Sequence, residues 1–225
     1  MKKIIITGSE GLIGSSVKAF LLEKGYDCLC LDMKLGHDLA DENFVRNFFL
    51  DNKATGLINL FALNHHIDLD HQKTNLFNIK LESFKQYLDI NLTSLFSVCR
   101  EFARNNSEAS IVNFSSTYGV TSPIKSLYHN EEKHIGYSVS KAGVIMLSKH
   151  LATHLAPNVR VNTVIPGGVY NSQSEEFIEK YSQLTPMKRM MNVSELNDIV
   201  EYLVSDKSSY VTGAEFKIEG GWTAW

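Results

Sequence analysis

The first 25 residues place a strand, a tight loop and a helix in immediate succession. Residues 4–6 are all isoleucine, a short apolar β-branched run that is typical of a buried strand. Residues 8–11 break this run, and apolar side chains then recur at helical spacing until Gly25. A buried strand that turns directly into a helix is the repeating unit of an α/β fold.

The same alternation continues along the chain. Further strands are predicted near residues 26–32, 56–61, 110–114, 159–165 and 215–218, and helices near residues 41–50, 81–104, 137–155, 174–183 and 194–204. Strands that alternate with helices predict a parallel sheet covered on both faces, in three α/β/α layers. The chain has no internal repeat, low-complexity tract or linker, so residues 1–225 are expected to form one domain.

Composition excludes several classes of protein. The chain of 225 residues is 44% hydrophobic and 21% charged, as in ordinary globular proteins. Its formal net charge of −3 provides no basic surface for nucleic acid, and it lacks the apolar stretch of about 20 residues that a membrane span needs. Of three cysteines, Cys28 and Cys30 share one side of a predicted strand, without the second pair that would complete a zinc site. We expect no metal and a cytoplasmic location.

The loop before the first helix predicts a dinucleotide site. Glycines allow a tight turn and a close approach to a pyrophosphate, which the N-terminus of the helix attracts. The strand–loop–helix context makes this glycine pattern more specific than the glycines alone. The loop residues expected to contact the cofactor are Gly8, Ser9, Glu10, Gly11, Leu12 and Ile13.

Two carboxylates favour NAD(H) over NADP(H). Asp32 ends the second strand, where its carboxylate can hold the adenosine ribose hydroxyls and repel the additional phosphate of NADP. Glu10 adds repulsion, and residues 7–14 contain no Lys or Arg. The alternative for Asp32 is an ordinary turn residue at the end of a strand.

Tyr137 and Lys141 are four residues apart, a spacing that places two side chains on one face of a helix. A tyrosine has a pKa of about 10 and is a poor base at neutral pH. A fixed ammonium nearby favours the phenolate, so this pair predicts a tyrosine with a lowered pKa that exchanges a proton. The alternative is a pair of side chains on the surface of a helix.

With these features in place, the chain resembles a short-chain dehydrogenase/reductase of the compact one-domain branch. The resemblance extends nearly from end to end, and the matching segments occur in the family's order. They are the glycine loop, Asn91 in the segment 89–92, the pair Ser115-Ser116, Tyr137 with Lys141, Pro166-Gly167, and the C-terminal segments 210–213 and 219–222. The resemblance implies a Rossmann-type, doubly wound parallel sheet and an NAD-dependent oxidoreductase.

The resemblance also assigns four catalytic residues. It implies that Tyr137 is the general acid/base for the substrate oxygen, and that Lys141 lowers the tyrosine pKa and binds the nicotinamide ribose. Ser116 would donate a hydrogen bond to the reacting oxygen, and Asn91 would order a helix and a water in the proton relay. Each has a structural alternative: a turn serine, a polar helix position or a solvated cation.

Further cofactor contacts follow from the resemblance alone. It implies contacts to adenine from Asp38 and Leu39, and a nicotinamide carboxamide held by the backbone of Val169. The threonine common near Val169 in the family aligns with Asn171, so that contact is an open question. The complete set of expected cofactor contacts outside the loop is Asp32, Asp38, Leu39, Asn59, Ala62, Tyr137, Lys141, Pro166, Gly167 and Val169.

The glycine spacing departs from the compact branch. Leu12 stands where those members have a middle glycine, and the spacing of Gly8, Gly11 and Gly14 is that of the extended branch, which acts on nucleotide sugars. The chain lacks the additional C-terminal length of that branch. The sequence therefore combines an extended-type loop with a compact body.

A deletion follows the second strand. Asp32 and Asp38 are only six residues apart, where the family has a helix and the beginning of an edge strand. We predict that the helix between the family's second and third strands is absent and that the edge strand is short or missing. The adenine pocket should then be more open.

An insertion precedes Tyr137. Ser116 and Tyr137 are 21 residues apart, which is longer than is common in the family, and residues 118–135 should overhang the substrate. Their polarity favours a hydroxyl-rich or charged substrate, and a solvated surface loop is the alternative. With Pro166 to Val169, this segment is similar to a bacterial subgroup linked to surface-sugar and flagellin-glycan biosynthesis.

Two other features leave alternatives open. His65, His66, Asp68, Asp70 and His71 form a cluster for which a polar pocket wall or a solvent loop is favoured over a metal site. The apolar stripes of the helices near 81–104 and 137–155 fit core packing, and the resemblance implies that these helices also form a homodimer or homotetramer interface.

The sequence as a whole predicts an NAD(H)-dependent oxidoreductase that interconverts a secondary alcohol and a ketone on a sugar or polar sugar derivative. One alternative is a sugar-nucleotide epimerase or dehydratase with bound NAD, which the glycine spacing suggests. The other is a non-catalytic, NAD-sensing scaffold, which would ordinarily show a broken set of catalytic residues. The substrate, the hydride face and the direction are left open.

Overall fold

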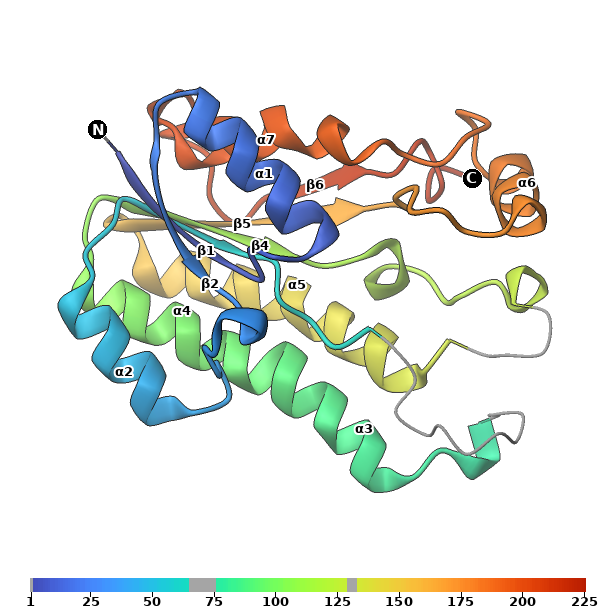
Figure 1. The fold of residues 1–225 in the computed structure, drawn as a ribbon, viewed down its shortest axis with the longest axis horizontal. Coiled ribbons are helices and arrows are strands. Elements are labelled where there is room, and N and C mark those ends of the chain that lie inside the picture. Colours follow the sequence, from blue (N-terminus) through green and yellow to red (C-terminus); the bar gives the residue numbers. More distant parts are fainter. Residues whose placement is uncertain (1, 65–75, 129–132) are drawn as a thin grey trace.

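The structure is a computed structural model that describes residues 2–64, 76–128 and 133–225. It contains a six-stranded sheet in the order β2-β1-β3-β4-β5-β6, in which every neighbouring pair is parallel (Figure 1). The strands are β1 (Lys3–Thr7), β2 (Asp27–Leu31), β3 (Gly56–Asn59), β4 (Ala109–Phe114), β5 (Val159–Pro166) and β6 (Glu215–Ile218). The predicted α/β, Rossmann-like fold is confirmed.

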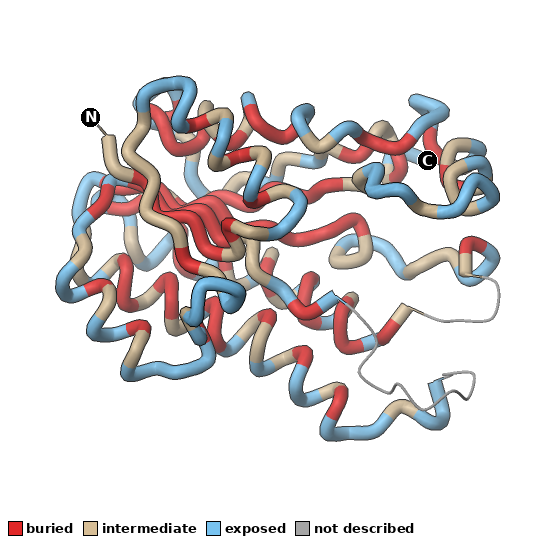
Figure 2. The backbone as a smooth tube through the Cα atoms, in the orientation of Figure 1, coloured by how far each residue is buried: buried red, intermediate tan, exposed pale blue. Residues whose placement is uncertain are grey.

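Helices cover both faces of this sheet (Figure 1). One layer contains α2 (Glu42–Asp51), α4 (Ser94–Asn105) and α5 (Ile135–Leu155), which pack on one core cluster that includes Ile5, Leu57 and Ile111. The other layer contains α1 (Leu12–Glu23) and α7 (Asn197–Val204), which pack on Ile4, Ile58 and Val112. Neighbouring residues of a strand face opposite layers, so the inner strands β1, β3, β4 and β5 are buried along nearly all of their length (Figure 2). The outermost strands β2 and β6 are more exposed. α3 (Leu81–Leu88) and α6 (Glu175–Leu184) complete the α-helices among the described residues.

The predicted deletion is confirmed. Between β2 and α2, where every residue is described, the chain forms only the 3₁₀ turn η1 (Met33–Leu35), and β2 is an edge strand of the sheet. Asp32 caps this turn, since its carboxylate accepts a hydrogen bond from the Lys34 backbone N–H at 2.9 Å. The described residues therefore contain neither the family's second helix nor its additional edge strand.

The region near 81–104 differs from the single helix that its apolar stripe predicts. A π-helical turn, η3 (Asp89–Thr93), separates α3 from α4. At its centre, the Asn91 amide exchanges two hydrogen bonds with the Leu63 backbone, at 2.6 and 3.0 Å, and donates to Ser140 Oγ at 3.0 Å. These bonds to distant segments accompany the wider turn, in line with the frequent occurrence of π-bulges at functional sites.

Two sequence features lie outside the described residues. The cluster from His65 to His71 falls within residues 65–75, and residues 129–132 belong to the insertion before Tyr137. Across the described ranges, no helix has the length and apolar character that crossing a membrane requires.

Candidate active site

The glycine loop packs so closely that two of its glycines have no room for a side chain. Gly8 has a φ of +71°, and a Cβ there would lie 2.5 Å from the Phe61 backbone nitrogen. A Cβ on Gly14 would lie 2.1 Å from the Gly8 carbonyl oxygen. The backbone of the loop is thereby held against the end of β3 and the first turn of α1.

The N-terminus of α1 is open toward a cavity. Its N-cap residue is Gly11, so no described side chain caps the first turn. The backbone N–H groups of a first helical turn have no partner within the helix, and with the helix dipole they favour an anion. Gly11, Leu12 and Ile13 all line the cavity, which places this anion-binding feature at its edge.

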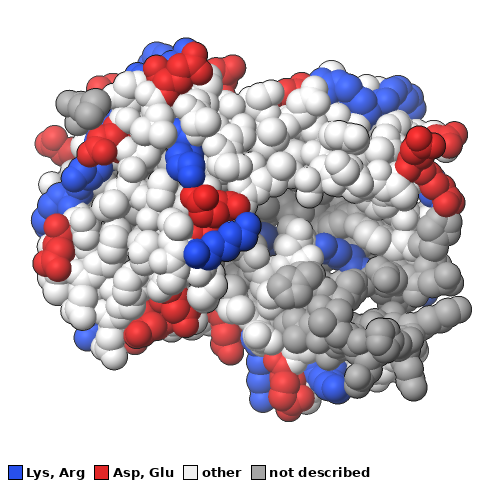
Figure 3. All heavy atoms as spheres, viewed as in Figure 1, with Lys and Arg blue, Asp and Glu red and all other residues white. Residues whose placement is uncertain are grey.

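The cavity has a volume of about 430 Å³ and lies beyond the carboxyl ends of the strands. Figure 3 shows the hollow on this face, with basic side chains visible inside it. The predicted site residues that line it are Gly8, Gly11, Leu12, Ile13, Ala62, Ser116, Tyr137, Lys141, Pro166, Gly167 and Val169. Ligands of open α/β sheets bind at this edge, so the cavity is the candidate active site.

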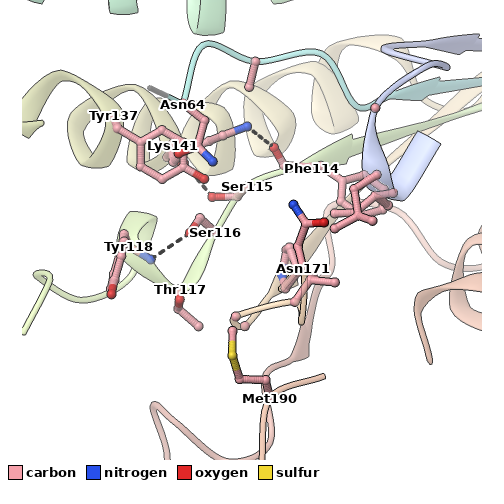
Figure 4. Close-up of a pocket in the computed structure, with 18 of the residues that line it drawn as sticks. Asn64, Phe114, Ser115, Ser116, Thr117, Tyr118, Tyr137, Lys141, Asn171 and Met190 are labelled. Atoms are coloured by element: carbon pink, nitrogen blue, oxygen red, sulfur yellow. Dashed lines mark hydrogen bonds between the residues drawn. The ribbon is translucent and has the colours of Figure 1, made fainter. Parts of the chain in front are cut away.

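Ser116, Tyr137 and Lys141 meet in the wall of the cavity (Figure 4). All three are buried, with 8%, 9% and 5% of their surface exposed. Lys141 Nζ donates to the Phe114 carbonyl oxygen at 2.8 Å and lies 5.9 Å from the centroid of the Tyr137 ring. Ser115 is used differently, because its hydroxyl donates to the Lys141 carbonyl oxygen at 2.7 Å.

Burial determines the protonation of this pair. It raises the pKa of Tyr137, and a hydrogen bond with Ser116 offsets only part of that effect. Burial also lowers the pKa of Lys141 to about 8. Desolvation has the largest effect on the Tyr137 pKa, and the expected lowering of that pKa by Lys141 stays a prediction. Tyr137 is therefore a protonated phenol at neutral pH.

Asn91 lies behind the cavity and does not line it. Its side chain is buried and joins the turn η3 to Leu63 and to Ser140, which is one residue before Lys141. The amide thus connects the segment after β3 to the helix that carries Tyr137 and Lys141. The two tasks expected of Asn91, ordering a helix and a water, stay predictions.

The Asp32 carboxylate lies under the glycine loop, with neighbours that the sequence argument did not anticipate. It accepts a hydrogen bond from the Glu10 backbone N–H at 2.9 Å. The Glu10 carboxylate pairs with Lys18 at 2.6 Å, so its charge is largely neutralised. Lys34 Nζ donates to the Glu10 carbonyl oxygen at 3.1 Å, which brings a cation to the glycine loop. Of these two carboxylates, Glu10 is the one that forms an ion pair with a described residue.

Three other predicted cofactor residues have side chains directed elsewhere. Asn59 is buried and donates to Asn113 Oδ1 at 2.8 Å. Leu39 packs in the core beside α2, and the Asp38 carboxylate accepts from the Ala40 backbone N–H at 2.9 Å. None of these three described residues lines the cavity. Ser9 is also fully buried.

The wall opposite Tyr137 and Asn64 carries Asn171 and Met190 (Figure 4). The Gln173 side chain links two backbone positions of this wall. Its amide donates to the Val169 carbonyl oxygen at 2.9 Å and accepts from the Asn171 backbone N–H at 2.7 Å. Asn171 lines the cavity at the position where the family commonly has a threonine.

The insertion contributes cavity residues that sequence reasoning did not assign. Tyr128 donates to the Tyr118 hydroxyl at 2.8 Å and packs on Phe177 of α6, with ring centroids 6.0 Å apart. Lys133 Nζ lies 4.5 Å from the centroid of the Tyr137 ring. Lys133 precedes Tyr137 by four residues, just as Tyr137 precedes Lys141. This repeated spacing is the sequence signal that could have indicated that Lys133 lies near Tyr137.

Comparison with known proteins identifies the family. A family model described as enoyl-(acyl carrier protein) reductase matches residues 23–223. The 3-oxoacyl-(acyl-carrier-protein) reductase FabG of Aquifex aeolicus is 31% identical over 97% of this chain and 86% of its own length. The chain belongs to the short-chain dehydrogenase/reductase family. It is thus an NAD(P)-dependent dehydrogenase/reductase.

Two further relatives of this short-chain dehydrogenase/reductase are informative. The post-translational flagellin modification protein A of Campylobacter coli is 30% identical over 76% of this chain and 68% of its own length. A short-chain dehydrogenase of Leptospira borgpetersenii, solved with bound NAD+, has a TM-score of 0.87 and 29% identity, and the match covers 99% of this chain and 92% of that one. The second comparison matches the fold nearly from end to end.

The site of this short-chain dehydrogenase/reductase fits a nicotinamide dinucleotide. The loop at Gly8 and Gly14 has space for backbone only, and the uncapped first turn of α1 presents donors suited to a pyrophosphate. The cavity then continues from this loop to Tyr137 and Lys141. Among the described residues, the lining contains two lysines and no Asp or Glu, which also suits an anionic ligand.

Proposed function

We propose that this enzyme interconverts a secondary alcohol and a ketone with NAD(H), on a sugar or polar sugar derivative. The observation that carries the proposal is the meeting of Ser116, Tyr137 and Lys141 in one cavity with the glycine loop. When bound, NADH supplies a hydride to the carbonyl carbon and becomes NAD⁺. The carbonyl oxygen takes up one proton, which balances the reduction.

The chain's own residues handle that proton. The Tyr137 phenol, whose pKa is raised by burial, donates its proton to the substrate oxygen and regains one from solvent. The Ser116 hydroxyl, which hydrogen-bonds the phenol, would also contact that oxygen. Lys141 contributes positive charge that stabilises the transient phenolate, and Asn91 positions α5 through Ser140. The reverse direction uses the same groups with the proton moving to Tyr137.

The polar lining of the cavity supports a hydroxyl-rich substrate. Asn64, Asn171, Gln173 and the tyrosine pair of the insertion surround the space near Tyr137. The similarity to a flagellin modification protein agrees with a sugar derivative. Loss of NADH absorbance with a panel of keto sugars and simple ketones tests the assignment, because an oxidoreductase consumes one NADH per alcohol formed.

A sugar-nucleotide epimerase or dehydratase is the second candidate. The spacing of Gly8, Gly11 and Gly14 favours it. Such an enzyme would change a nucleotide sugar without net NADH consumption. Chromatography of the products, with NADH measured in the same samples, separates the two reactions.

For the cofactor, we propose NAD(H) over NADP(H), and Asp32→Asn tests this choice. The substitution keeps an oxygen for the Lys34 N–H and removes the charge that repels a phosphate. Because hydrogen bonds to charged groups are worth about 1.5–3 kcal/mol, kcat/KM for NADH relative to NADPH should fall about 10-fold or more. Asp27→Asn, at the other end of β2, is the matched control and should leave the ratio unchanged.

The opposite cofactor preference would indicate that Lys34 binds the additional phosphate of NADP. If the wild-type enzyme prefers NADPH and Lys34→Met abolishes that preference, Asp32 does not select the cofactor. The nearness of Lys34 Nζ to the Glu10 carbonyl makes this comparison informative.

We also propose a homo-oligomer through the outer faces of α4 and α5, either a dimer or a tetramer. Phe96 on α4 and Val139 and Met146 on α5 are exposed apolar side chains, with Met146 65% exposed. Met146→Glu would place a charge in such an interface, so light scattering should show a shift to the monomer mass. Met187→Glu, at a methionine of similar exposure outside these helices, is the control. A wild-type monomer, or an unchanged Met146→Glu assembly, contradicts the proposed interface.

A further inference from the structure

Lys133 brings a second ammonium to the substrate side of the cavity. Its Nζ donates to the Asn64 side-chain oxygen at 2.5 Å and to the Asn64 carbonyl oxygen at 3.3 Å. It lies 4.5 Å from the centroid of the Tyr137 ring, closer than Lys141, which lies 5.9 Å away. The phenol that handles the proton is therefore flanked by two lysines with different surroundings.

The two lysines differ in their burial and in their hydrogen-bond partners. Lys141 is almost completely buried and its Nζ donates to the Phe114 carbonyl oxygen. The described contacts of the Lys133 ammonium are to Asn64 and to the Tyr137 ring, and no described Asp or Glu lines the cavity. Among the described lining residues, this is a local excess of positive charge. A cation in such a cavity, whose hydrogen-bond partner among the described residues is a neutral amide, can bind an anion that enters from outside.

The position of Lys133 excludes the pyrophosphate as its partner. The pyrophosphate donors are the glycine loop and the first turn of α1, whereas Lys133 contacts Asn64 beyond β3 and the Tyr137 ring. Burial lowers the pKa of Lys133 to about 8, so its amine is still mostly protonated at pH 7. An arriving anion would favour the charged form further.

We propose that Lys133 binds the carboxylate of the substrate, and that the substrate is a hydroxy acid or oxo acid, including acids of the sugar type. Because Lys133 Nζ lies against the ring whose hydroxyl contacts the reacting oxygen, the carboxylate must be close to the reacting carbon. A 2-oxo or 3-oxo acid meets this condition. The inference rests on the proposed oxidoreductase function and narrows its substrate class.

Matched acids and esters test the role of Lys133 in catalysis. The probes are pyruvate, 2-oxobutyrate and acetoacetate, each compared with its methyl ester, in the presence of NADH. The wild-type enzyme should favour at least one acid over its ester. Lys133→Met should reduce kcat/KM for that acid about 10- to 100-fold, mainly through KM, with little change for the ester. Lys133→Arg should keep much of the preference, since it keeps the charge.

A lysine at the N-terminal ends of the strands, on the side of the sheet away from the cavity, provides the matched control. Lys53 is exposed and precedes β3 at its N-terminal end. Lys53→Met should leave the acid-to-ester ratio unchanged. A wild-type enzyme that uses esters as well as acids, or a Lys133→Met variant that keeps the acid preference, overturns the assignment while the oxidoreductase function stands.

A binding measurement separates this proposal from the proposed function. Tyr137→Phe with NADH is an arrested complex into which acetoacetate can be titrated by calorimetry. Binding in Tyr137→Phe and at least 10-fold weaker binding in Tyr137→Phe/Lys133→Met support the carboxylate site even if no ketone is reduced. Equal affinity in the two variants, or no binding of acetoacetate, pyruvate and 2-oxobutyrate to Tyr137→Phe, overturns it.

Discussion

Tyr137→Phe should reduce turnover by about 10²- to 10⁴-fold, the range for removal of a general acid or base. The substitution deletes one hydroxyl from a buried ring and keeps its packing in the cavity wall. Burial raises the pKa of the phenol, so the phenol carries its proton at neutral pH and can donate it. NADH affinity should change little, because the glycine loop and the first turn of α1 are untouched.

Steady-state rates and NADH fluorescence titrations measure these two effects separately. Tyr210→Phe, at a fully exposed tyrosine, is the control and should match the wild type in both. If Tyr137→Phe turns over within about threefold of the wild-type rate, another group carries the proton and the assignment of Tyr137 is wrong.

Gly14→Ala should weaken NADH binding by about 10-fold or more and destabilise the fold by about 1–3 kcal/mol, as overpacking does. Two effects oppose each other at this position. Alanine is preferred to glycine inside a helix by about 1 kcal/mol, which would stabilise α1. The added Cβ would, however, lie 2.1 Å from the Gly8 carbonyl oxygen and 2.9 Å from the Ser9 Cα. These are backbone atoms, so the loop itself must move, and we expect the steric effect to dominate.

Gly11→Ala is the matched control for Gly14→Ala. Its Cβ would lie 3.3 Å from the same oxygen, so a small adjustment should be enough. Urea unfolding and calorimetric NADH titration of both variants compare the two positions. A Gly14→Ala protein that is more stable than the wild type and binds NADH normally would show that the loop accommodates a side chain.

The sequence predicted the sheet and the deletion because both depend on local signals. The isoleucine run and the glycine loop define a strand and a turn within a few residues of one another. The five residues between Asp32 and Asp38 are too few for a helix and a strand, and the structure has only a 3₁₀ turn there.

Long-range contacts account for the features that were not predicted. The π turn at Asn91 accompanies hydrogen bonds to Leu63 and Ser140, which are 28 and 49 residues away. An apolar stripe contains no information about such partners, so it predicts one continuous helix. The direction of the Tyr137 pKa likewise depends on burial by several segments, whereas sequence spacing shows only the nearby Lys141.

The charge pairs near the glycine loop also depend on contacts that the sequence pattern does not show. Glu10 looks repulsive in the sequence, but the first turns of α1 bring Lys18 to its carboxylate. Lys34 reaches the loop only because the deletion leaves a short turn after β2. The roles of Lys133 and of the tyrosine pair depend on how the insertion folds against Tyr137 and α6.

The most direct test of the oxidoreductase assignment is deuterium transfer from NADH. Keto sugars and oxo acids are incubated with NADH deuterated at C4, in separate samples for each face, and the products are analysed by mass spectrometry. We expect an alcohol that carries one deuterium on the former carbonyl carbon, from one face of NADH only, with one NADH consumed per alcohol. Deuterium-free isomerised or dehydrated products without net NADH consumption would contradict it.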